Sequence, residues 1–334
     1  MKKIVLMLLF LFMICGCNNV MNNTNGEVNV LNWTSYIPQE VLDDFEKEYG
    51  IKVNYGTYSS NEELLAKISS SKPGTYDVIF PSDYMVELMI KKDMLMPIDK
   101  YKITNYSNIN SLFLKQQFDR NNEYSLPFLA ATTVIAVNRD KVHGQIEGYN
   151  DLLSDEFNNN IVLLDDQRIV IGMGLQASGY SMNETDINKL NKGKEWLLKL
   201  NKNVKAFDSD SPKTFLITNE TSIGVMWNAE AIIAKEYNPN IEIIYPKDGF
   251  AISLDNYTIV KGAKNIENSY KFINYLLRDD VNKKITDEYP YLNTTYANMN
   301  LDYSELKMVL DKASFVENIG HSISNYDKIW AEIK

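Results

Sequence analysis

The chain has 334 residues, of which 45% are hydrophobic and 23% are charged, and these fractions exclude a collagen-like, disulfide-scaffold or generally disordered protein. At about 100–200 residues per domain, the length predicts two domains. The 34 basic and 44 acidic residues give a net charge of −10, which argues against a nucleic-acid-binding protein because that class needs a basic face.

The N-terminal segment has the pattern of a secretion signal. Two lysines precede an unbroken apolar run over residues 4–14. This run is too short to cross a bilayer, which takes about 20 apolar residues, and has the length of a signal-peptide core. It leads into Gly16-Cys17, which resembles the cleavage site of bacterial lipoproteins. We expect residues 1–16 to be a lipoprotein signal peptide and Cys17 to be acylated; an ordinary cleaved signal peptide is the alternative.

The next segment, residues 17–26, is polar and rich in asparagine, which indicates a tether. Both cysteines of the chain lie at or before its start, so no internal disulfide is expected. No later apolar run approaches spanning length. We therefore expect a body that is held to a membrane surface by lipid.

From residue 28 onward, patterns typical of strands and helices alternate. Strands are predicted over 28–33, 51–55, 77–80, 132–137, 160–164, 222–227, 241–245 and 257–260. Helical spacing predicts a helix that begins at Pro38 and stops at Gly50, and another over 268–277. Ser60 and Glu63 form a capping-box pattern that opens a further helix. The alternation predicts an α/β fold whose sheet is covered by helices.

Polar or aromatic residues follow several predicted strands, at the point where each strand ends. They are Trp33-Thr34, Ser82-Asp83-Tyr84, Asp165-Asp166 and Trp227-Asn228. In open α/β sheets, ligands bind outside the carboxyl ends of the strands. Turns also begin there, which explains polar residues but accounts less well for the tryptophans.

Catalytic and cofactor motifs are weak or missing. The two histidines, His143 and His321, are far apart, and no zinc, nucleophile-elbow or phosphate-loop pattern occurs. Gly172-x-Gly174-x-x-Ala177 imitates a dinucleotide fingerprint but does not directly follow a predicted strand. Neither a metal nor a cofactor is expected. An acid/base enzyme that uses Asp165 or Asp166 remains a minor alternative.

The residues after the strands suit a slender organic cation. Carboxylates bind its ammonium groups, and aromatic faces cover its methylenes. The candidate carboxylates are Asp166, Asp255 and Asp83, and the candidate aromatic residues are Trp33, Tyr36, Tyr84, Trp227 and Tyr289. With 21 tyrosines in the chain, composition alone makes this only a suggestion.

Several motifs, in order along the chain, resemble those of the bacterial spermidine/putrescine-binding proteins, the extracytoplasmic receptors of ATP-driven polyamine importers. They are Asn32-Trp-Thr-Ser-Tyr-Ile-Pro38, Ser59-Ser-Asn-Glu62, Tyr76-Asp-Val-Ile-Phe-Pro-Ser82, Met226-Trp-Asn228 and Tyr270-Lys-Phe-Ile-Asn-Tyr-Leu-Leu-Arg278. The resemblance implies a two-lobed, periplasmic-binding-protein-like (type II) fold, with crossing strands and hinged lobes that close over a ligand. Lobe 1 would comprise 28–133 plus 255–300, and lobe 2 would comprise 134–254 plus 301–334.

By position, the resemblance implies ligand-binding roles for Trp33, Thr34, Tyr36, Ser82, Tyr84, Asp166, Trp227, Asp255 and Tyr289. Four positions depart from the family pattern: Ser35 stands where members often carry an acid, Ile169 replaces a glutamate, Ser253 a tryptophan and Val316 a glutamine. Asp83 and Glu230 are extra acids that could compensate. Because an unpaired buried charge is costly, fewer carboxylates favour putrescine over spermidine, or weaker binding of both.

The expected partners are a polyamine, the membrane permease of an ABC importer, and the lipid membrane through Cys17; no nucleic acid is expected, and the protein is expected to be a monomer. Another solute remains the alternative, because a fold does not fix a function. A sugar pocket would favour neutral amides, and an anion pocket would need arginines. The chain has only four arginines, which weakens the anion alternative.

Overall fold

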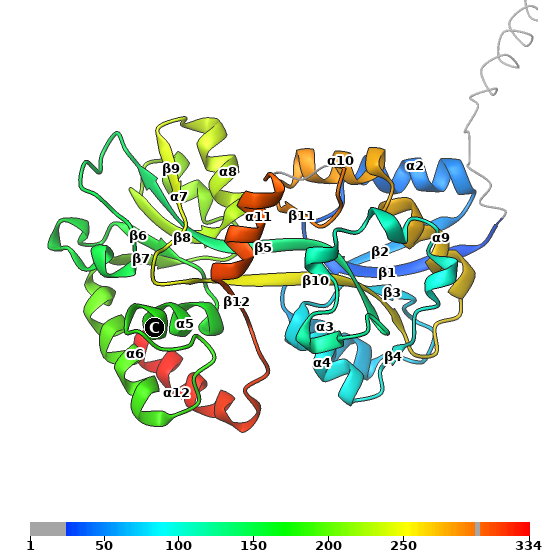
Figure 1. Ribbon diagram of the computed structural model, residues 1–334, viewed down its shortest axis with the longest axis horizontal. Coiled ribbons are helices and arrows are strands. Elements are labelled where there is room, and N and C mark those ends of the chain that lie inside the picture. Colours follow the sequence, from blue (N-terminus) through cyan, green and yellow to red (C-terminus); the bar gives the residue numbers. More distant parts are fainter. Residues whose placement is uncertain (1–24, 298–300) are drawn as a thin grey trace, which may run out of the picture.

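The structure is a computed structural model that describes residues 25–297 and 301–334. It has two lobes that are joined by two long strands (Figure 1), as predicted. The predicted signal peptide, Cys17 and most of the predicted tether lie outside the described residues. Within the described part of the chain, no helix is both long and apolar enough to cross a membrane.

Lobe 1 contains a mixed sheet with helices on both faces. Strand β1 (Glu27–Trp33) lies between β2 (Lys52–Tyr58) and β3 (Val78–Ile79), parallel to both, while β4 (Leu95–Met96) and β3 pair with β10 (Phe250–Val260). The helices of this lobe are α2 (Gln39–Tyr49), α3 (Asn61–Ser70), α4 (Asp83–Lys91), α9 (Ile266–Leu276) and α10 (Asp279–Glu288). Alternate β1 residues point to opposite faces, because Val28 and Val30 pack in one core cluster and Leu31 in another.

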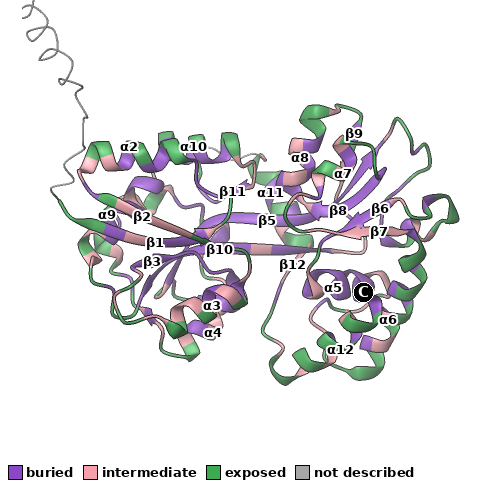
Figure 2. Ribbon diagram, turned by 180° about the vertical axis from the view of Figure 1, so that it is seen from behind, coloured by how far each residue is buried: buried purple, intermediate pink, exposed green. Residues whose placement is uncertain are grey.

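Lobe 2 repeats this arrangement. Strand β6 (Ile161–Leu163) lies between β7 (Val204–Phe207) and β8 (Ile223–Trp227), parallel to both, and β9 (Ile241–Ile244) is a further strand. Its helices are α5 (Gln167–Ala177), α6 (Ile187–Leu200), α7 (Lys213–Ile217), α8 (Asn228–Tyr237) and α12 (Ile323–Ile333). The strands are mostly buried and the outer faces of the helices are exposed (Figure 2).

The lobes are joined by β5 (Ser125–Asn138) and β10, which run antiparallel. Strand β5 pairs with β10 up to Thr132, and from Thr133 onward its partners are β8 and β9. The short strands β11 (Leu292–Asn293) and β12 (Ala313–Phe315) pair with β5 and β10, respectively. The exact division of the chain between the lobes stays a prediction.

Helix α11 (Tyr303–Lys312) lies over the crossing strands (Figure 1). Its Leu306 and Val309 pack in a cluster with Phe113 and Leu254. This helix had been assigned to lobe 2 on sequence grounds. Its apolar face packs against residues of the crossing strands, and its assignment to lobe 2 stays a prediction.

Most predicted elements are confirmed, with differences at their ends. Gly50 ends α2 with a φ of 63°, a conformation that favours glycine. Pro38 is the residue before α2 rather than its first residue. The backbone N–H of Glu63 donates to the Ser60 hydroxyl at 3.1 Å, whereas the Glu63 carboxylate accepts from the N–H of Ser59. Only half of the predicted capping box is therefore present.

The two crossing strands are much longer than predicted. The sequence predicted strands over 132–137 and 257–260, which are parts of β5 and β10. In β10, the polar residues Ser253, Asp255 and Asn256 interrupt the apolar run, and the pairing register shifts at Asp255/Asn256. Pairing with β5 decides the length of this strand, and local pattern does not reveal that pairing.

The glycines that imitate a dinucleotide fingerprint lie inside α5 rather than in a phosphate-binding loop. A Cβ atom at Gly174 would lie only 2.7 Å from Leu197 Cγ and 2.8 Å from the carbonyl oxygen of Gly193. Both contacts belong to α6. Gly174 therefore allows α5 and α6 to pack closely, which explains the motif without a cofactor.

Candidate functional site

Asp255 is the centre of a buried polar cluster in lobe 1. An isolated β-bridge places it beside Ser82, whose hydroxyl donates to Asp255 Oδ1 at 2.7 Å. The Tyr36 hydroxyl donates to Asp255 Oδ2 at 2.8 Å. Asp255 is only 2% exposed, and burial raises its pKa to about 6 although hydrogen bonds from Ser82, Tyr36 and Trp33 lower it. The carboxyl is thus held by neutral donors.

A second carboxyl, that of Asp83, lies next to this cluster at the start of α4. It accepts hydrogen bonds from the backbone N–H groups of Tyr84 at 2.7 Å and Leu254 at 3.3 Å. Asp83 is 1% exposed. Burial raises its pKa to about 8, Asp255 adds to this rise, and Arg168 opposes it. Two buried carboxyl groups therefore share one region of lobe 1.

Ser82 occupies the N-cap position of α4, but it makes no side-chain cap hydrogen bond. Its hydroxyl is instead used by Asp255. The residue therefore holds the buried carboxylate rather than the helix end. This difference depends on β10, which reaches Ser82 from far along the chain.

Aromatic rings surround the acidic cluster. The Trp33 indole N–H donates to the carbonyl oxygen of Phe80 at 3.0 Å, and its ring centroid lies 4.6 Å from that of Tyr58. The ring of Tyr36 lies 4.8 Å from that of Tyr291. Tyr289 is half-buried directly after α10. These rings provide an apolar surface beside the carboxyl groups.

Thr34 lies at the end of β1 with an exposed side chain. Its hydroxyl donates weakly to the carbonyl oxygen of Tyr58, at 3.4 Å, and its backbone N–H donates to the same oxygen at 3.2 Å. The next residue, Ser35, has a φ of 57°, so the chain turns sharply here. This turn places Tyr36 next to Asp255.

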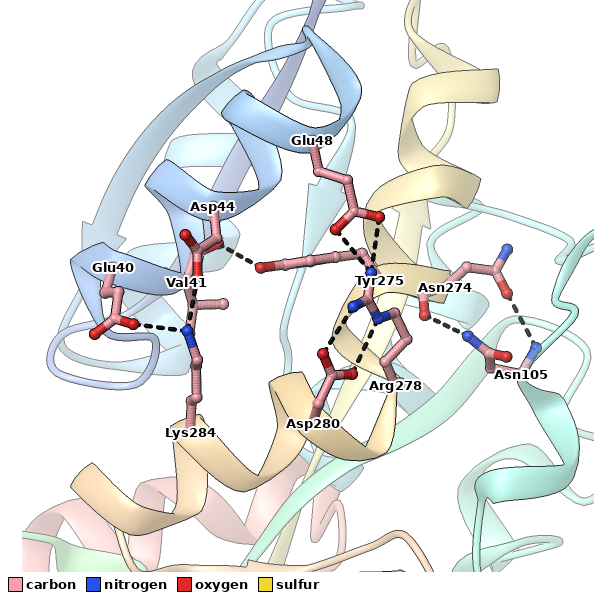
Figure 3. A network of polar contacts seen from close by, with 10 residues as sticks. All are labelled: Glu40, Val41, Asp44, Glu48, Asn105, Asn274, Tyr275, Arg278, Asp280 and Lys284. Atoms are coloured by element: carbon pink, nitrogen blue, oxygen red, sulfur yellow. Dashed lines mark hydrogen bonds and ion pairs between the residues drawn. The ribbon is translucent and has the colours of Figure 1, made fainter.

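A network of ion pairs fixes helix α10, which leads into Tyr289 (Figure 3). Arg278 donates to both carboxylate oxygens of Glu48 at 2.8 Å and also binds Asp280. Lys284 pairs with two acids of α2, Glu40 and Asp44, at 2.6 and 2.7 Å. The network ties α10 to α2 and thereby sets where the Tyr289 segment leaves the helix.

Lobe 2 contributes Asp166, which caps α5. Its Oδ1 accepts from the backbone N–H groups of Arg168 at 2.8 Å and Ile169 at 3.1 Å. Burial raises the pKa of Asp166, and Glu62 of lobe 1 adds to this rise. The neighbouring Asp165 is exposed and pairs with Lys334 at 2.6 Å. The two aspartates therefore have different partners.

Tyr84 lies between the candidate site residues of lobe 1 and those of lobe 2. It packs against core clusters of both lobes, and its hydroxyl donates to Glu62 Oε1 at 3.1 Å. Trp227 is the last residue of β8, packs against the same lobe 2 cluster and is half-buried. The sequence-predicted residues are thus divided between a lobe 1 group and a lobe 2 group, and Tyr84 bridges them.

The structure shows where the residues that depart from the family pattern lie. Ile169 and Val316 are buried together in the apolar cluster of lobe 2. Ser253 is half-buried on β10 opposite Ala131. Glu230, which could have compensated for a missing acid, already binds the ammonium of Lys213 through both carboxylate oxygens at 2.8 Å.

The sequence reasoning did not single out Tyr58, Tyr291, Arg168 or Lys213. Tyr58 ends β2 beside Trp33, so the strand-end pattern could have found it. Tyr291 follows Tyr289 by two residues, but nothing local indicates that it meets Tyr36. Among the residues that the structure describes, no group of three or more potential ligands is placed to hold a metal ion.

The chain is similar to known bacterial solute-binding proteins. A family model described as bacterial extracellular solute-binding protein matches residues 40–303. The spermidine/putrescine-binding periplasmic protein of Salmonella typhimurium is 36% identical, over 93% of this chain and 92% of that protein. The relatives found are solute-binding proteins rather than enzymes.

Solved structures of solute-binding proteins are also similar to this chain, and two of them each match 92% of it. One is the spermidine/putrescine ABC transporter substrate-binding protein PotD from Streptococcus pneumoniae, with 31% identity, a TM-score of 0.81 and 98% of its own chain covered. The other is the PotD lipoprotein of Treponema pallidum, with 25% identity, a TM-score of 0.83 and 99% coverage. The family resemblance is confirmed: the chain belongs to the bacterial extracellular solute-binding proteins and is similar to their spermidine/putrescine-binding members.

Proposed function

We propose that this protein is an extracytoplasmic receptor that binds putrescine, spermidine or both and delivers them to an ABC importer. The observation that carries the proposal is the buried Asp255 carboxylate, which two neutral hydroxyls hold beside aromatic rings. Burying an ionised carboxylate without a cation is costly. A ligand ammonium would remove this cost, which gives the site a preference for cationic ligands.

In the proposed complex, one ammonium group binds Asp255, and Asp83 adds negative charge next to it. The rings of Trp33 and Tyr36 cover the methylenes from lobe 1. Cation–π contacts of this kind contribute about 0.5–2 kcal/mol each. The remaining proposed ligand-binding residues are Thr34, Ser82, Tyr84, Asp166, Trp227 and Tyr289, and Asp166 receives the other end of the ligand.

The departures from the family pattern support a preference for a diamine. Ile169 and Val316 add apolar surface to lobe 2, and Ser253 offers no ring. With fewer carboxylates available, the site balances fewer ammonium groups. We propose that putrescine binds more tightly than spermidine, or that both bind more weakly than in a receptor that carries all the ligand-binding residues of the family pattern.

Attachment and partners complete the proposal. Residues 1–16 direct export, Cys17 carries the lipid, and the body acts as a monomer on the outer face of a membrane. The permease of an ABC importer takes the ligand from it. The protein performs no chemical reaction, requires no cofactor and binds no nucleic acid. Small polar solutes other than polyamines are the alternative ligands.

Calorimetric titration tests this function. Residues 18–334, which include every described residue, are unfolded and refolded to remove bound ligand and then titrated with putrescine, cadaverine, spermidine and spermine. Tight one-to-one binding, with a higher affinity for putrescine than for spermidine, supports both the receptor function and the diamine preference. A higher affinity for spermidine than for putrescine supports the receptor function but contradicts the diamine preference. No heat and no thermal stabilisation with any amine contradicts polyamine binding.

A further inference from the structure

Lobe 2 holds an ion pair that its sequence did not predict. Lys213 begins α7 and Glu230 lies in the first turn of α8. The lysine Nζ lies 2.8 Å from both carboxylate oxygens. The side chains are only 24% and 13% exposed, whereas most described ion pairs are at the surface. An ion pair that is sheltered from water is screened less than a surface pair.

Glu230 lies in the first turn of α8, the helix that begins directly after Trp227, a proposed ligand-binding residue. Burial raises the pKa of Tyr291, a residue of lobe 1, and the charge of Glu230 adds to this rise. The Tyr291 ring lies 4.8 Å from that of Tyr36, whose hydroxyl donates to Asp255. Helices α7 and α8 lie on the same side of the crossing strands as α10 and β11 (Figures 1 and 2). Glu230 therefore lies on a helix of lobe 2 that begins next to a proposed ligand-binding residue, whereas Asp255 belongs to the lobe 1 group.

The chemistry of Lys213 matches that of the proposed ligand. A lysine side chain is an aminobutyl group, and putrescine and spermidine also carry primary ammonium groups on short methylene chains. Bound by both oxygens of Glu230, Lys213 occupies a carboxylate that would otherwise be available to a ligand ammonium.

We infer that Lys213 is a specificity-determining residue: it acts as a built-in ammonium that neutralises Glu230 and so prevents a longer polyamine from placing an additional ammonium there. This inference rests on the proposed polyamine-binding function and names a cause for a diamine preference. It differs from the argument about Ile169 and Ser253, because here the acid is present but already occupied.

The substitution Lys213→Met tests the inference. It removes the charge but keeps an unbranched apolar side chain, so Glu230 becomes available to ligand. We expect the spermidine affinity to rise relative to that of putrescine by about tenfold, the size of one additional charge-assisted contact. The double variant Lys213→Met/Glu230→Gln has no free carboxylate and should return the ratio of affinities to that of the wild type.

A matched control is Lys194→Met, which breaks the ion pair of Lys194 with Glu332 on the outer surface of the same lobe and should leave the ratio unchanged. Glu230→Gln gives a second test: Lys213 then lacks its counter-charge, and both affinities should fall, that of spermidine more.

An unchanged ratio in Lys213→Met overturns the inference while polyamine binding by the wild type keeps the proposed function intact. If Lys213→Met does not fold, equal affinities in Glu230→Gln and wild type overturn it. A wild type that binds none of the amines overturns the proposed function, and this inference with it.

Discussion

The two walls of the candidate site, one formed by lobe 1 and the other by lobe 2, are built differently. In lobe 1, Asp255 and Asp83 are almost fully buried and are held by hydroxyl and backbone donors. In lobe 2, Asp166 is half-buried and is used as a helix cap, while Glu230 is already paired with Lys213. Lobe 1 therefore holds two buried carboxyl groups without an ion-pair partner among the described residues, whereas these lobe 2 acids are used as a helix cap or are already paired.

This difference suggests an order of events for the proposed receptor. A cation gains most from Asp255, so it would bind lobe 1 first, and closure of lobe 2 would follow. In such hinged proteins, the ligand stabilises the closed arrangement only through contacts that it makes better in that arrangement. The following predictions test the contrast between the walls, beginning with the largest effect.

The substitution Asp255→Asn should lower polyamine affinity by about 2–5 kcal/mol, because it removes the partner of a buried ammonium. Calorimetric titration measures the loss. The empty protein should not become less stable to heat, since a buried carboxylate is replaced by a neutral amide. Asp165→Asn, which changes an exposed aspartate that pairs with Lys334, should leave binding unchanged. Wild-type affinity in Asp255→Asn would mean that the site lies elsewhere.

The substitution Tyr36→Phe should weaken binding by about 1–3 kcal/mol, because the Asp255 carboxylate loses a hydrogen-bond donor. The ring remains and can still stack on Tyr291, so the effect isolates the hydroxyl. Tyr101→Phe is a suitable control, since Tyr101 is 99% exposed. Equal loss in the two variants would contradict a specific role for the Tyr36 hydroxyl.

Binding should tighten as the pH rises from about 6 to 8, because an ammonium ligand favours ionised Asp255 and Asp83, whose pKa values burial raises to about 6 and 8. Protons should be released on binding, which is measured by titration in buffers of different ionisation enthalpy. Asp83→Asn should reduce the proton release and flatten the profile. A wild-type affinity that does not change over this range would contradict the prediction.

The same two groups predict how stability depends on pH. Their pKa values are raised in the folded protein, so the folded state binds more protons than the unfolded state between about pH 4 and 8. The stability of the empty protein should therefore fall as the pH rises through this range. Thermal unfolding of the wild type and of Asp83→Asn, which should show a weaker decline, measures the effect.

The smallest effect is expected from Arg278→Ala, which breaks the network between α10 and α2 (Figure 3). Partly exposed ion pairs contribute about 0–1 kcal/mol each, so thermal unfolding should shift by only a few degrees. Polyamine affinity should change by less than about threefold, an energy below 1 kcal/mol, since Tyr289 is only indirectly held. A large loss of affinity would show that α10 itself positions the ligand.

Sequence reasoning succeeded where local pattern carries the information. The alternation over 28–33 predicted β1, and Gly50 predicted the end of α2. The Asn-Trp-Thr-Ser-Tyr-Ile-Pro motif led to the prediction that Trp33 and Tyr36 bind the ligand. That role stays a prediction, although the structure does place the Tyr36 hydroxyl against Asp255. Sequence reasoning failed for the lengths of β5 and β10, which depend on strand pairing between distant segments.

The sequence by itself determined the alternation of strands and helices, the family membership and the residue types that could bind a cation. Only the tertiary structure decided which of these acids remain without a counter-charge. Asp255 and Ser82 are brought together by β10 and the β3–α4 junction, and Glu230 is neutralised by Lys213 from a neighbouring helix. The reason is physical: whether a carboxylate is available depends on its burial and its neighbours, and both are properties of the folded chain.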